Sequence, residues 1–510
     1  MTSQRQADVA LILEGTYPYV AGGVSMWTHH LIQAHANLSF ELICLVAERA
    51  ELKPRYSVPS NVTGITTIRV GSITAGDRNP GGLKALSQRL EGPLLRLQAG
   101  GGLAEVEKII EEIRPFRSGI GRRALLNSPE AWELILRMYR AMHPESPFLD
   151  YFWSWRAILG GIFSMLLAPL PAARIYHAVS TGYAGLYAAR AHLETGRPAL
   201  LTEHGIYTNE RRIEIAMADW LYQPAESGLT LEKSPRDLKL MWYEAFAAYS
   251  RACYEAASRI ITLYSGNQYF QLADGAPPEK LAIIPNGVDY QRFSVLTEQR
   301  TRHAPAIALI GRVVPIKDVK TFLRAAAIVR ELVPEIQVFV LGPADEDLQY
   351  FAECQALVQY LGLENCVQFT GPVSIADYLP RLDVVVLTSI SEAQPLVILE
   401  AGAAGVPSVA TDVGACREML CGSPTENPQL GPGGEVTPLS NPTATAHAIC
   451  RLLLDHDRWQ AASRAIRERV RLYYDRPALD QAYAELYDYW RSAPDQPPAA
   501  SPPIAGKDAA

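Results

Sequence analysis

The chain has 510 residues, of which 48% are hydrophobic, and this length suffices for two large domains or three small ones. Its net charge of −7, without a run rich in lysine or arginine, argues against a nucleic-acid partner. The seven cysteines show no C-x-x-C spacing, which indicates buried side chains in a reducing compartment rather than a disulfide framework or a zinc site.

Short apolar runs of the buried-strand type alternate with helical patterns along most of the chain. This alternation predicts parallel sheets with crossover helices. The predicted strands are 9–13, 42–46, 175–179, 199–202, 260–263, 282–284, 306–310, 338–341, 367–370 and 384–388. After Gly434 the pattern is helical, and from residue 492 onward proline and alanine predict a disordered tail.

The interval of about 71–171 breaks this rhythm. Helical patterns at 103–113 and 129–142 predict a mostly helical insertion in the first domain. Its segment 157–171 is uncharged, but it is shorter than the ~20 residues that span a bilayer. We interpret this segment as a buried helix, with a docking surface for a membrane partner or the bilayer interface as the alternative.

Two positions in the first half carry candidate binding residues. Gly22 and Gly23 precede a helical pattern that opens near Ser25, so the N–H groups of a helix start can face a ligand; an ordinary turn is the alternative. His204 follows Glu203 at the end of the strand predicted at 199–202. This histidine is either a ligand contact or a hydrogen-bonded core residue.

Two cations follow the strand predicted at 306–310. Arg312 lies just past its end, and Lys317 lies at the mouth of the next helix. An arginine fork and a lysine point charge beside a glycine turn can together hold both phosphates of a diphosphate. Each cation alone is also compatible with an ordinary surface position.

Two carboxylates follow the last predicted strand, 384–388. Glu392 is expected in a loop and Glu400 in a helix over 396–405, with Pro395 at the first helical position. The carboxyl ends of parallel strands bind ligands, and a helix start favours an anion there. The alternative for the two glutamates is a solvated helix face.

These segments together resemble the retaining glycosyltransferases of the two-Rossmann-domain (GT-B) type, family 4. The resemblance implies an α/β fold in which two Rossmann-like domains face a cleft, with the mostly helical insertion in the N-terminal domain. The runs LILEGTYPYVAGGVSMW and LTEHGIYTNERR, together with the insertion, resemble more narrowly the glycosyltransferases of Pel exopolysaccharide systems over nearly the full length.

The resemblance implies four catalytic residues. Arg312 and Lys317 neutralise the charge that develops on the leaving diphosphate. Glu392 holds hydroxyl groups of the donor sugar, and His204 lies near the outer hydroxyl of that sugar.

The resemblance also implies a donor-binding set without a metal or a cofactor. Its members are Gly22, Gly23, Gly371, Val373, Gln394, Leu396, Val397 and Glu400. Among them, Glu400 holds the ribose hydroxyls, and the loop of Gly371 and Val373 contacts the base. The acidic triplets at 345–347 and 455–457 are interpreted as solvated turns.

Two segments depart from the family pattern. Ala393-Gln394-Pro395 stands where many relatives have Gly-Phe-Gly or Gly-x-Pro, so no aromatic ring lines the sugar there. The donor-sugar contacts then fall to Gln394 and to the N–H groups of the following helix start. Gly414-Ala415 stands where a Gly-Gly pair is frequent, which weakens the case for close approach of this backbone to the donor.

We expect an acceptor domain over 1–295 that contains the insertion at about 71–171, and a donor domain over 296–472. A helix over 473–491 is expected to return to the first domain, ahead of the disordered tail at 492–510.

The expected function is retaining, metal-independent transfer of a hexosyl unit from a UDP-sugar, with UDP-glucose favoured by the resemblance, to a carbohydrate acceptor in Pel-type exopolysaccharide biosynthesis. The expected location is cytoplasmic, peripheral to the inner membrane through a polysaccharide synthesis complex. Alternatives are a catalytically silent scaffold subunit of such a complex, and a GT-B epimerase or phosphorylase.

Overall fold

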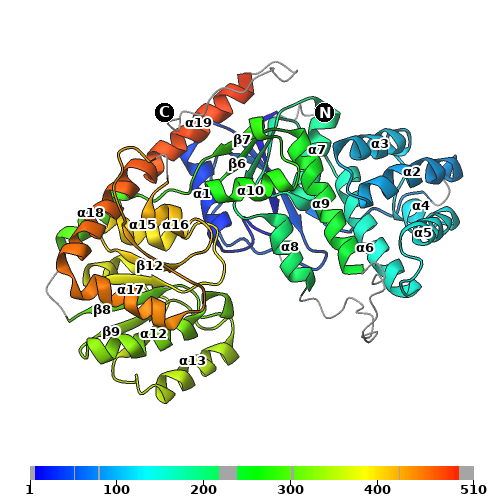
Figure 1. Cartoon of the computed structure of the whole chain (residues 1–510). Helices are drawn as coiled ribbons and strands as arrows, with labels where there is room; N and C mark the ends of the chain where they lie inside the picture. Colours follow the sequence, from blue (N-terminus) through cyan, green and yellow to red (C-terminus); the bar gives the residue numbers. More distant parts are fainter. Residues whose placement is uncertain are drawn as a thin grey trace. The chain divides into compact units, whose positions relative to one another are not determined.

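The computed structural model describes residues 6–50, 52–77, 81–216, 238–299, 304–423 and 426–492, so the predicted tail lies almost wholly outside the described residues. The chain forms two compact units (Figure 1). Unit 1 takes Met1–Thr262 and Asn267–Ala282, together with the last helix from Ala484 onward. Unit 2 takes Leu263–Gly266 and Ile283–Tyr483.

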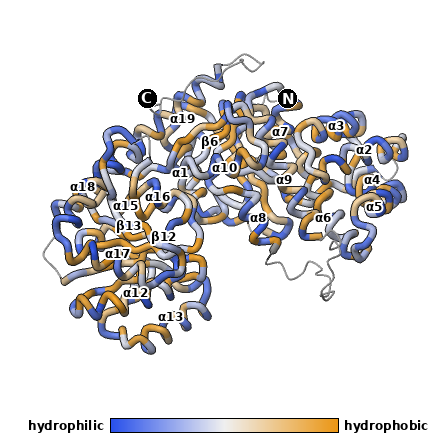
Figure 2. Tube along the Cα trace, viewed as in Figure 1, coloured by the Kyte–Doolittle hydropathy of each residue, from blue (hydrophilic) through white to orange (hydrophobic). Residues whose placement is uncertain are grey.

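Unit 1 contains a seven-stranded sheet in the order β3-β2-β1-β4-β5-β6-β7. Neighbouring strands from β3 to β6 run parallel. The strands are β1 (Ala7–Glu14), β2 (Phe40–Val46), β3 (Val62–Arg69), β4 (Ala173–Ala178), β5 (Ala199–Glu203), β6 (Ala257–Thr262) and β7 (Leu281–Ile283). Strands buried on both faces read as long apolar runs, as β2 (FELICLV) does with all but one of its residues buried. Figure 2 shows hydrophobic colours among the strands of this sheet near the β6 label.

The helices around this sheet follow its strands in the chain. They are α1 (Gly23–Ala34), α7 (Gly182–Thr195), α8 (Tyr207–Ala216), α9 (Leu238–Ala256), α10 (Ser265–Ala273) and η2 (Pro278–Lys280). The first helix begins at Gly23, two residues before the predicted start at Ser25.

The interval between β3 and β4 is helical, as the sequence predicts. Its helices are α2 (Leu83–Gln98), α3 (Leu103–Ile113), η1 (Arg114–Phe116), α4 (Arg122–Leu125), α5 (Pro129–Met142) and α6 (Phe148–Leu167). Every residue of α6 from Ile158 to Leu166 is buried, so the uncharged segment 157–171 is a core helix as far as Leu167, where α6 ends. Within the described ranges, no helix has both the length and the apolar character needed to cross a membrane.

Unit 2 contains a six-stranded parallel sheet in the order β10-β9-β8-β11-β12-β13. The strands are β8 (Ala306–Ile310), β9 (Gln337–Leu341), β10 (Val367–Gly371), β11 (Val384–Leu387), β12 (Ser408–Thr411) and β13 (Gly434–Thr437). The helices are α11 (Tyr290–Ser294), η3 (Val295–Gln299), η4 (Pro315–Lys317), α12 (Val319–Leu332), α13 (Leu348–Tyr360), α14 (Ile375–Tyr378), η5 (Leu379–Arg381), α15 (Leu396–Ala403), α16 (Cys416–Cys421), α17 (Pro442–Leu454) and α18 (His456–Tyr473). The last helix, α19 (Arg476–Ser492), begins in unit 2 and belongs to unit 1 from Ala484 onward.

A separate apolar core covers each face of this sheet, because side chains alternate along a strand. In β8, Ala308 and Ile310 point to the core of α15, α16 and α18, whereas Ile307 and Leu309 point to the core of α12, α13 and α17. The sheet is therefore buried on both sides and exposes only its ends and edges.

The sequence analysis missed three strands, β3, β12 and β13. β3 alternates between half-buried and exposed residues at a sheet edge, and β12 has only four residues. The helical pattern expected after Gly434 is wrong for its first residues, because Gly434–Thr437 pairs with β12 as edge strand β13. The helices follow from Pro442.

Each sheet has one point where the strand order reverses, between β1 and β4 in unit 1 and between β8 and β11 in unit 2. In open α/β sheets, ligands bind in the crevice outside the carboxyl ends of the strands at such a point. In unit 2 we therefore expect a site at the loops after β8 and β11. In unit 1 we expect one at the loops after β1 and β4.

Candidate functional site

An ion pair joins the two loops at the switch point of unit 2. Lys317, at the end of η4 after β8, donates from Nζ to Glu392 Oε1 in the loop after β11. Their side chains are 20% and 13% exposed. Thr388 Oγ1 donates to the carbonyl oxygens of Lys317 and Asp318, at 3.1 and 2.9 Å, so the Thr388 side chain also joins the two loops. The structure thus brings two predicted catalytic residues together.

Arg312 lies beside this pair in the same loop but holds a different carboxylate. Its Nη1 lies 2.7 and 2.6 Å from the two carboxylate oxygens of Glu346, which follows β9, and both side chains are about half exposed. Asp347, the last residue of the first acidic triplet, caps α13. Each of the two predicted phosphate-binding cations therefore already holds a carboxylate, which an incoming anion has to share or replace.

The start of α15 differs from the prediction by one position. Pro395 has extended backbone and occupies the N-cap, so the helix begins at Leu396 and the expected first helical position of Pro395 is wrong. The N–H groups of Leu396 and Val397 head this helix. The side chain of Gln394 is buried, and its Oε1 accepts from Asn286 N at 2.6 Å. Its Nε2 has no hydrogen-bond partner among the described residues.

Glu400 lies on α15, eight residues after Glu392. Burial raises the pKa of its carboxyl to about 7, against the opposing effect of the Arg292 and Arg476 charges. A carboxyl with this pKa is half protonated at neutral pH. Glu400 is therefore not on a solvated helix face, and neither is the largely buried Glu392.

Gly371 and Val373 lie at the same edge of the sheet. Gly371 ends β10 with φ +70°, and a Cβ added to it would meet open space. The carbonyl oxygen of Gly371 accepts from Gly342 N at 3.1 Å, which ties the ends of β9 and β10 together. Val373 packs against the core on the α15 face of the sheet.

The backbone of Gly414 packs against the loop that carries Glu392. Its φ is +52°, and a Cβ on it would lie 2.1 Å from the carbonyl oxygen of Glu392 and 2.4 Å from that of Ala393. Ala415 N donates to Ala393 O at 2.8 Å. The sequence analysis considered Gly414 only for approach to a donor, whereas its backbone packs against the loop that carries a candidate catalytic residue.

The candidate residues of unit 1 lie at the carboxyl ends of its strands and at the start of α1. Gly22 and Gly23 are exposed, and a Cβ on either would meet open space. His204 is 8% exposed, and burial lowers its pKa to about 4, so the imidazole is neutral at pH 7. Its Nε2 makes no hydrogen bond to any described residue. A neutral imidazole whose Nε2 has no partner among the described residues can form a hydrogen bond with a hydroxyl group of a ligand.

The neighbouring Glu203 has a structural role. Its carboxylate accepts from Tyr254 Oη at 2.8 Å, Gln271 Nε2 at 2.9 Å, Tyr207 N at 3.2 Å and Thr181 Oγ1 at 3.3 Å. Burial nevertheless raises its pKa to about 7. These contacts hold the end of β5 in place and thereby fix the backbone from which His204 projects.

Two residues of unit 1 were missed from the sequence. Trp27 of α1 meets the His204 ring edge-on, with the ring centroids 4.6 Å apart and the planes at 77°. Glu14, at the end of β1, accepts from Tyr207 Oη at 2.8 Å and from Ala184 N at 3.1 Å, and burial raises its pKa. An aromatic residue one turn after the glycine pair, and an acid ending an apolar strand, were the available signals.

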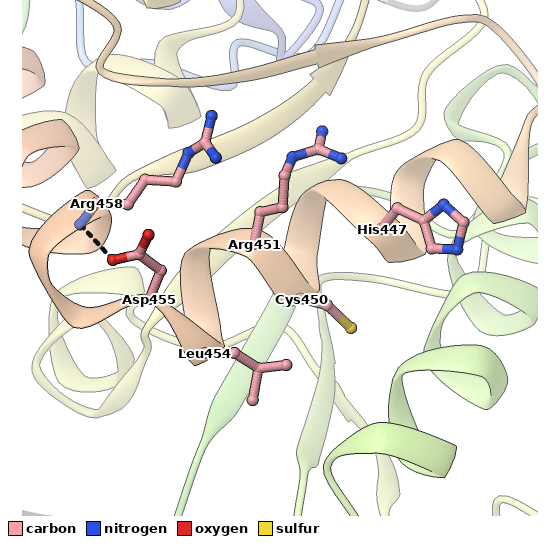
Figure 3. A pocket seen from close by; sticks show the side chains of 6 residues that line it. All are labelled: His447, Cys450, Arg451, Leu454, Asp455 and Arg458. Atoms are coloured by element: carbon pink, nitrogen blue, oxygen red, sulfur yellow. Dashed lines mark hydrogen bonds between the residues drawn. The ribbon is translucent and has the colours of Figure 1, made fainter.

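Other hollows and acidic groups of the described structure offer less. No set of three or more His, Cys, Asp or Glu side chains in the described ranges is arranged to hold a metal ion. A hollow of about 450 Å³ on unit 2 is lined by His447, Cys450, Arg451, Leu454, Asp455 and Arg458 (Figure 3). Both of its arginines form ion pairs with Glu435, and none of its residues is a candidate site residue.

Comparison with known proteins identifies the family. Residues 7–279, more than half of the chain, match the family described as "Domain of unknown function (DUF3492)", and residues 304–455 match "Glycosyl transferases group 1". The chain belongs to the DUF3492 family, and residues 304–455 of its second half are similar to the group 1 glycosyltransferase domain. That domain spans both loops of the Lys317–Glu392 pair and Glu400.

The chain spans about half the length of the curated relatives that it matches. It is 28% identical over 234 residues to the D-inositol 3-phosphate glycosyltransferase of Corynebacterium urealyticum, which covers 43% of this chain and 52% of the relative. It is 28% identical over 270 residues to the MMP alpha-(1->4)-mannosyltransferase of Mycolicibacterium hassiacum, which covers 52% of this chain and 58% of the relative.

Solved structures share the fold over nearly the whole chain. Sucrose-phosphate synthase from Thermosynechococcus elongatus matches with a TM-score of 0.55 and 18% identity, over 94% of this chain and 98% of that one. HepE from Anabaena in complex with UDP matches with a TM-score of 0.55 and 15% identity, over 94% and 100%. These matches confirm the predicted GT-B fold with two Rossmann-like units.

The support from Gly414 predicts a larger loss of stability than its φ alone explains. Gly414→Ala should lower the free energy of unfolding by about 2–5 kcal/mol, because ~1–2 kcal/mol for a left-handed alanine adds to ~1–3 kcal/mol for overpacking. Gly371→Ala is the matched control, since it also has positive φ but meets open space. Urea titration of both variants measures the difference, and equal losses would contradict the packing role.

Proposed function

We propose that the protein is a glycosyltransferase that moves a hexosyl unit from a UDP-sugar to a hydroxyl group of a carbohydrate acceptor. The observation that carries this proposal is the Lys317–Glu392 pair at the switch point of unit 2, inside the group 1 glycosyltransferase match. A cation at this edge can balance a diphosphate, and a carboxylate beside it can accept hydrogen bonds from sugar hydroxyls.

In the proposed reaction, the bond between the anomeric carbon and the diphosphate oxygen breaks while the acceptor oxygen bonds to that carbon. The acceptor proton passes to the departing diphosphate, and attack from the face that the diphosphate vacates retains the donor configuration. Arg312, Lys317 and the N–H groups at the start of α15 stabilise the negative charge on the leaving group. These positive groups take the role that a divalent ion has in metal-dependent transferases.

The resemblance proposes roles for the remaining residues. Glu400, close to Arg292 and Arg476, takes the ribose hydroxyls, and the loop of Gly371 and Val373 takes the base. Gln394 reaches the donor sugar through its unpartnered Nε2. In unit 1, Gly22, Gly23 and His204 contact the sugar.

The donor and the pathway are the finer parts of the proposal. UDP-glucose is the proposed donor, supported by HepE structures that contain UDP or UDP-glucose. The resemblance of the chain, over nearly its full length, to the Pel-system glycosyltransferase PelF supports a role in Pel-type exopolysaccharide synthesis. Such a role would place the protein in the cytoplasm, beside an inner-membrane synthesis complex.

Removal of the proposed phosphate-binding cations tests the function. Lys317→Ala and Arg312→Ala should each lower turnover roughly ten- to a hundredfold, because a charged hydrogen bond contributes about 1.5–3 kcal/mol. The assay is nucleoside diphosphate release with a panel of nucleotide sugars. Lys320→Ala is the matched control, because it breaks a lysine–glutamate pair with Glu353 away from the switch point. Near wild-type turnover of the double variant would overturn the assignment, and a silent scaffold would show no turnover even in the wild type.

The raised pKa of Glu400 predicts a pH dependence of donor binding. Ribose hydroxyls donate to the ionised carboxylate, and with a pKa of about 7 this form is scarce at pH 6 and dominant at pH 8. Affinity for UDP-glucose should therefore rise roughly tenfold from pH 6 to pH 8, in proportion to the competent fraction. Calorimetry at both pH values measures this change, and UDP-glucose lacks the terminal phosphate that titrates near pH ~6.

Glu400→Gln provides the control for this titration. The variant should bind UDP-glucose more weakly at pH 8 and show almost no pH dependence. A rise of the same size in wild type and variant would assign the titration to another group and contradict the role of Glu400.

A further inference from the structure

A wholly buried histidine connects the last helix to the strand ends of unit 1. His177, on β4, has its Nδ1 2.7 Å from the hydroxyl of Tyr487 on α19 and its Nε2 2.9 Å from Thr202 Oγ1 on β5. Tyr487 is completely buried. Burial lowers the pKa of His177 to about 3, so its neutral ring is held by two hydroxyl groups. The sequence analysis noticed neither residue.

Trp27 continues this contact to His204. The indole of Trp27 meets His177 edge-on, with centroids 6.5 Å apart and planes at 89°, and it meets His204 at 4.6 Å. Thr202, the second partner of His177, also lies two residues before His204 on the same strand end. The buried His177 ring is therefore linked to His204 in two ways, by the aromatic contacts of Trp27 and by its hydrogen bond to Thr202 on β5.

The Tyr487 hydroxyl is not what docks α19 on unit 1. Arg491 on the same helix lies 3.7 Å from Asp8, and Leu486 and Trp490 are buried apolar residues. The ring of Tyr487 itself packs edge-on against Phe40. Loss of the hydroxyl alone would leave these contacts in place while leaving a buried imidazole nitrogen without that partner, which is costly in an apolar environment.

We propose that Tyr487 and His177 are positioning residues for His204, so that the last helix of the chain is part of the sugar site of unit 1. This inference rests on the proposed function, which places His204 beside the transferred sugar. Tyr487 sets the orientation of the His177 ring, His177 sets that of Trp27, and Trp27 supports the imidazole whose Nε2 is open to a sugar hydroxyl. None of these side chains carries a charge at neutral pH, as suits recognition of a hydroxyl group.

A double-mutant cycle tests the proposal. Tyr487→Phe should lower kcat/KM for the best donor of the panel roughly five- to thirtyfold, but less than about twofold when His204 is already alanine. A purely structural role would lower activity by the same factor in both backgrounds. Tyr489→Phe is the matched control, because it removes a hydroxyl from the same helix two residues away.

A second measurement does not depend on turnover. The imidazole ¹⁵N signals of His204, assigned by their loss in His204→Ala, should shift in Tyr487→Phe and stay in place in Tyr489→Phe. Unchanged signals in Tyr487→Phe would overturn the proposal, whatever the activity.

The outcomes separate this inference from the proposed function. If His204→Ala keeps full turnover, the role of His204 in the proposed function fails. If His204→Ala loses turnover and Tyr487→Phe acts equally in both backgrounds, only the positioning role fails.

Discussion

The contact on which the candidate site depends is the ion pair between Lys317 and Glu392. It forms because β8 and β11 are neighbours in the sheet, although 73 residues of the chain lie between the end of β8 and the start of β11. The loops after the two strands therefore meet, and Thr388 fastens them through the backbone of the Lys317 loop. The backbone of Gly414 also packs closely against the Glu392 loop. The geometry of the pair is thus a property of the whole sheet rather than of either loop.

The candidate residues of the two units differ in their charge states. In unit 2, charged groups with partners stand at the strand ends, and a diphosphate can exchange with those partners. In unit 1, burial lowers the pKa of His177 and His204, which keeps both rings neutral, and raises the pKa of Glu14 and Glu203. Neutral buried groups recognise hydroxyls without the desolvation cost of a charge. This contrast agrees with the proposed division between a diphosphate in unit 2 and a sugar in unit 1.

Much of the fold follows from local pattern in the sequence. Strands such as Ala306–Ile310 are buried on both faces, so their apolar runs are unmistakable, and the bounds of α3 and α5 match their helical patterns. The edge strand Gly434–Thr437 was missed because its pairing with β12, rather than its own composition, makes it a strand.

The site could be predicted only as a set of residue types. That Arg312, Lys317, Glu392 and Glu400 stand after strands was readable from the chain. Which cation meets which carboxylate depends on the order of the strands in the sheet. Arg312 pairs with Glu346, for example, because β8 and β9, the strands that precede them, are neighbours. The collision that confines position 414 to glycine, and the contact between Tyr487 and His177, join segments far apart in sequence. No local pattern contains such information.

The central claim is that this chain transfers a sugar using its own positive groups in place of a metal ion. NMR of the anomeric proton of the product, formed from UDP-glucose and a carbohydrate acceptor in excess EDTA, tests it most directly. The account predicts continued transfer and a product with the α configuration of the donor. Loss of transfer in EDTA, or a β linkage in the product, would contradict it.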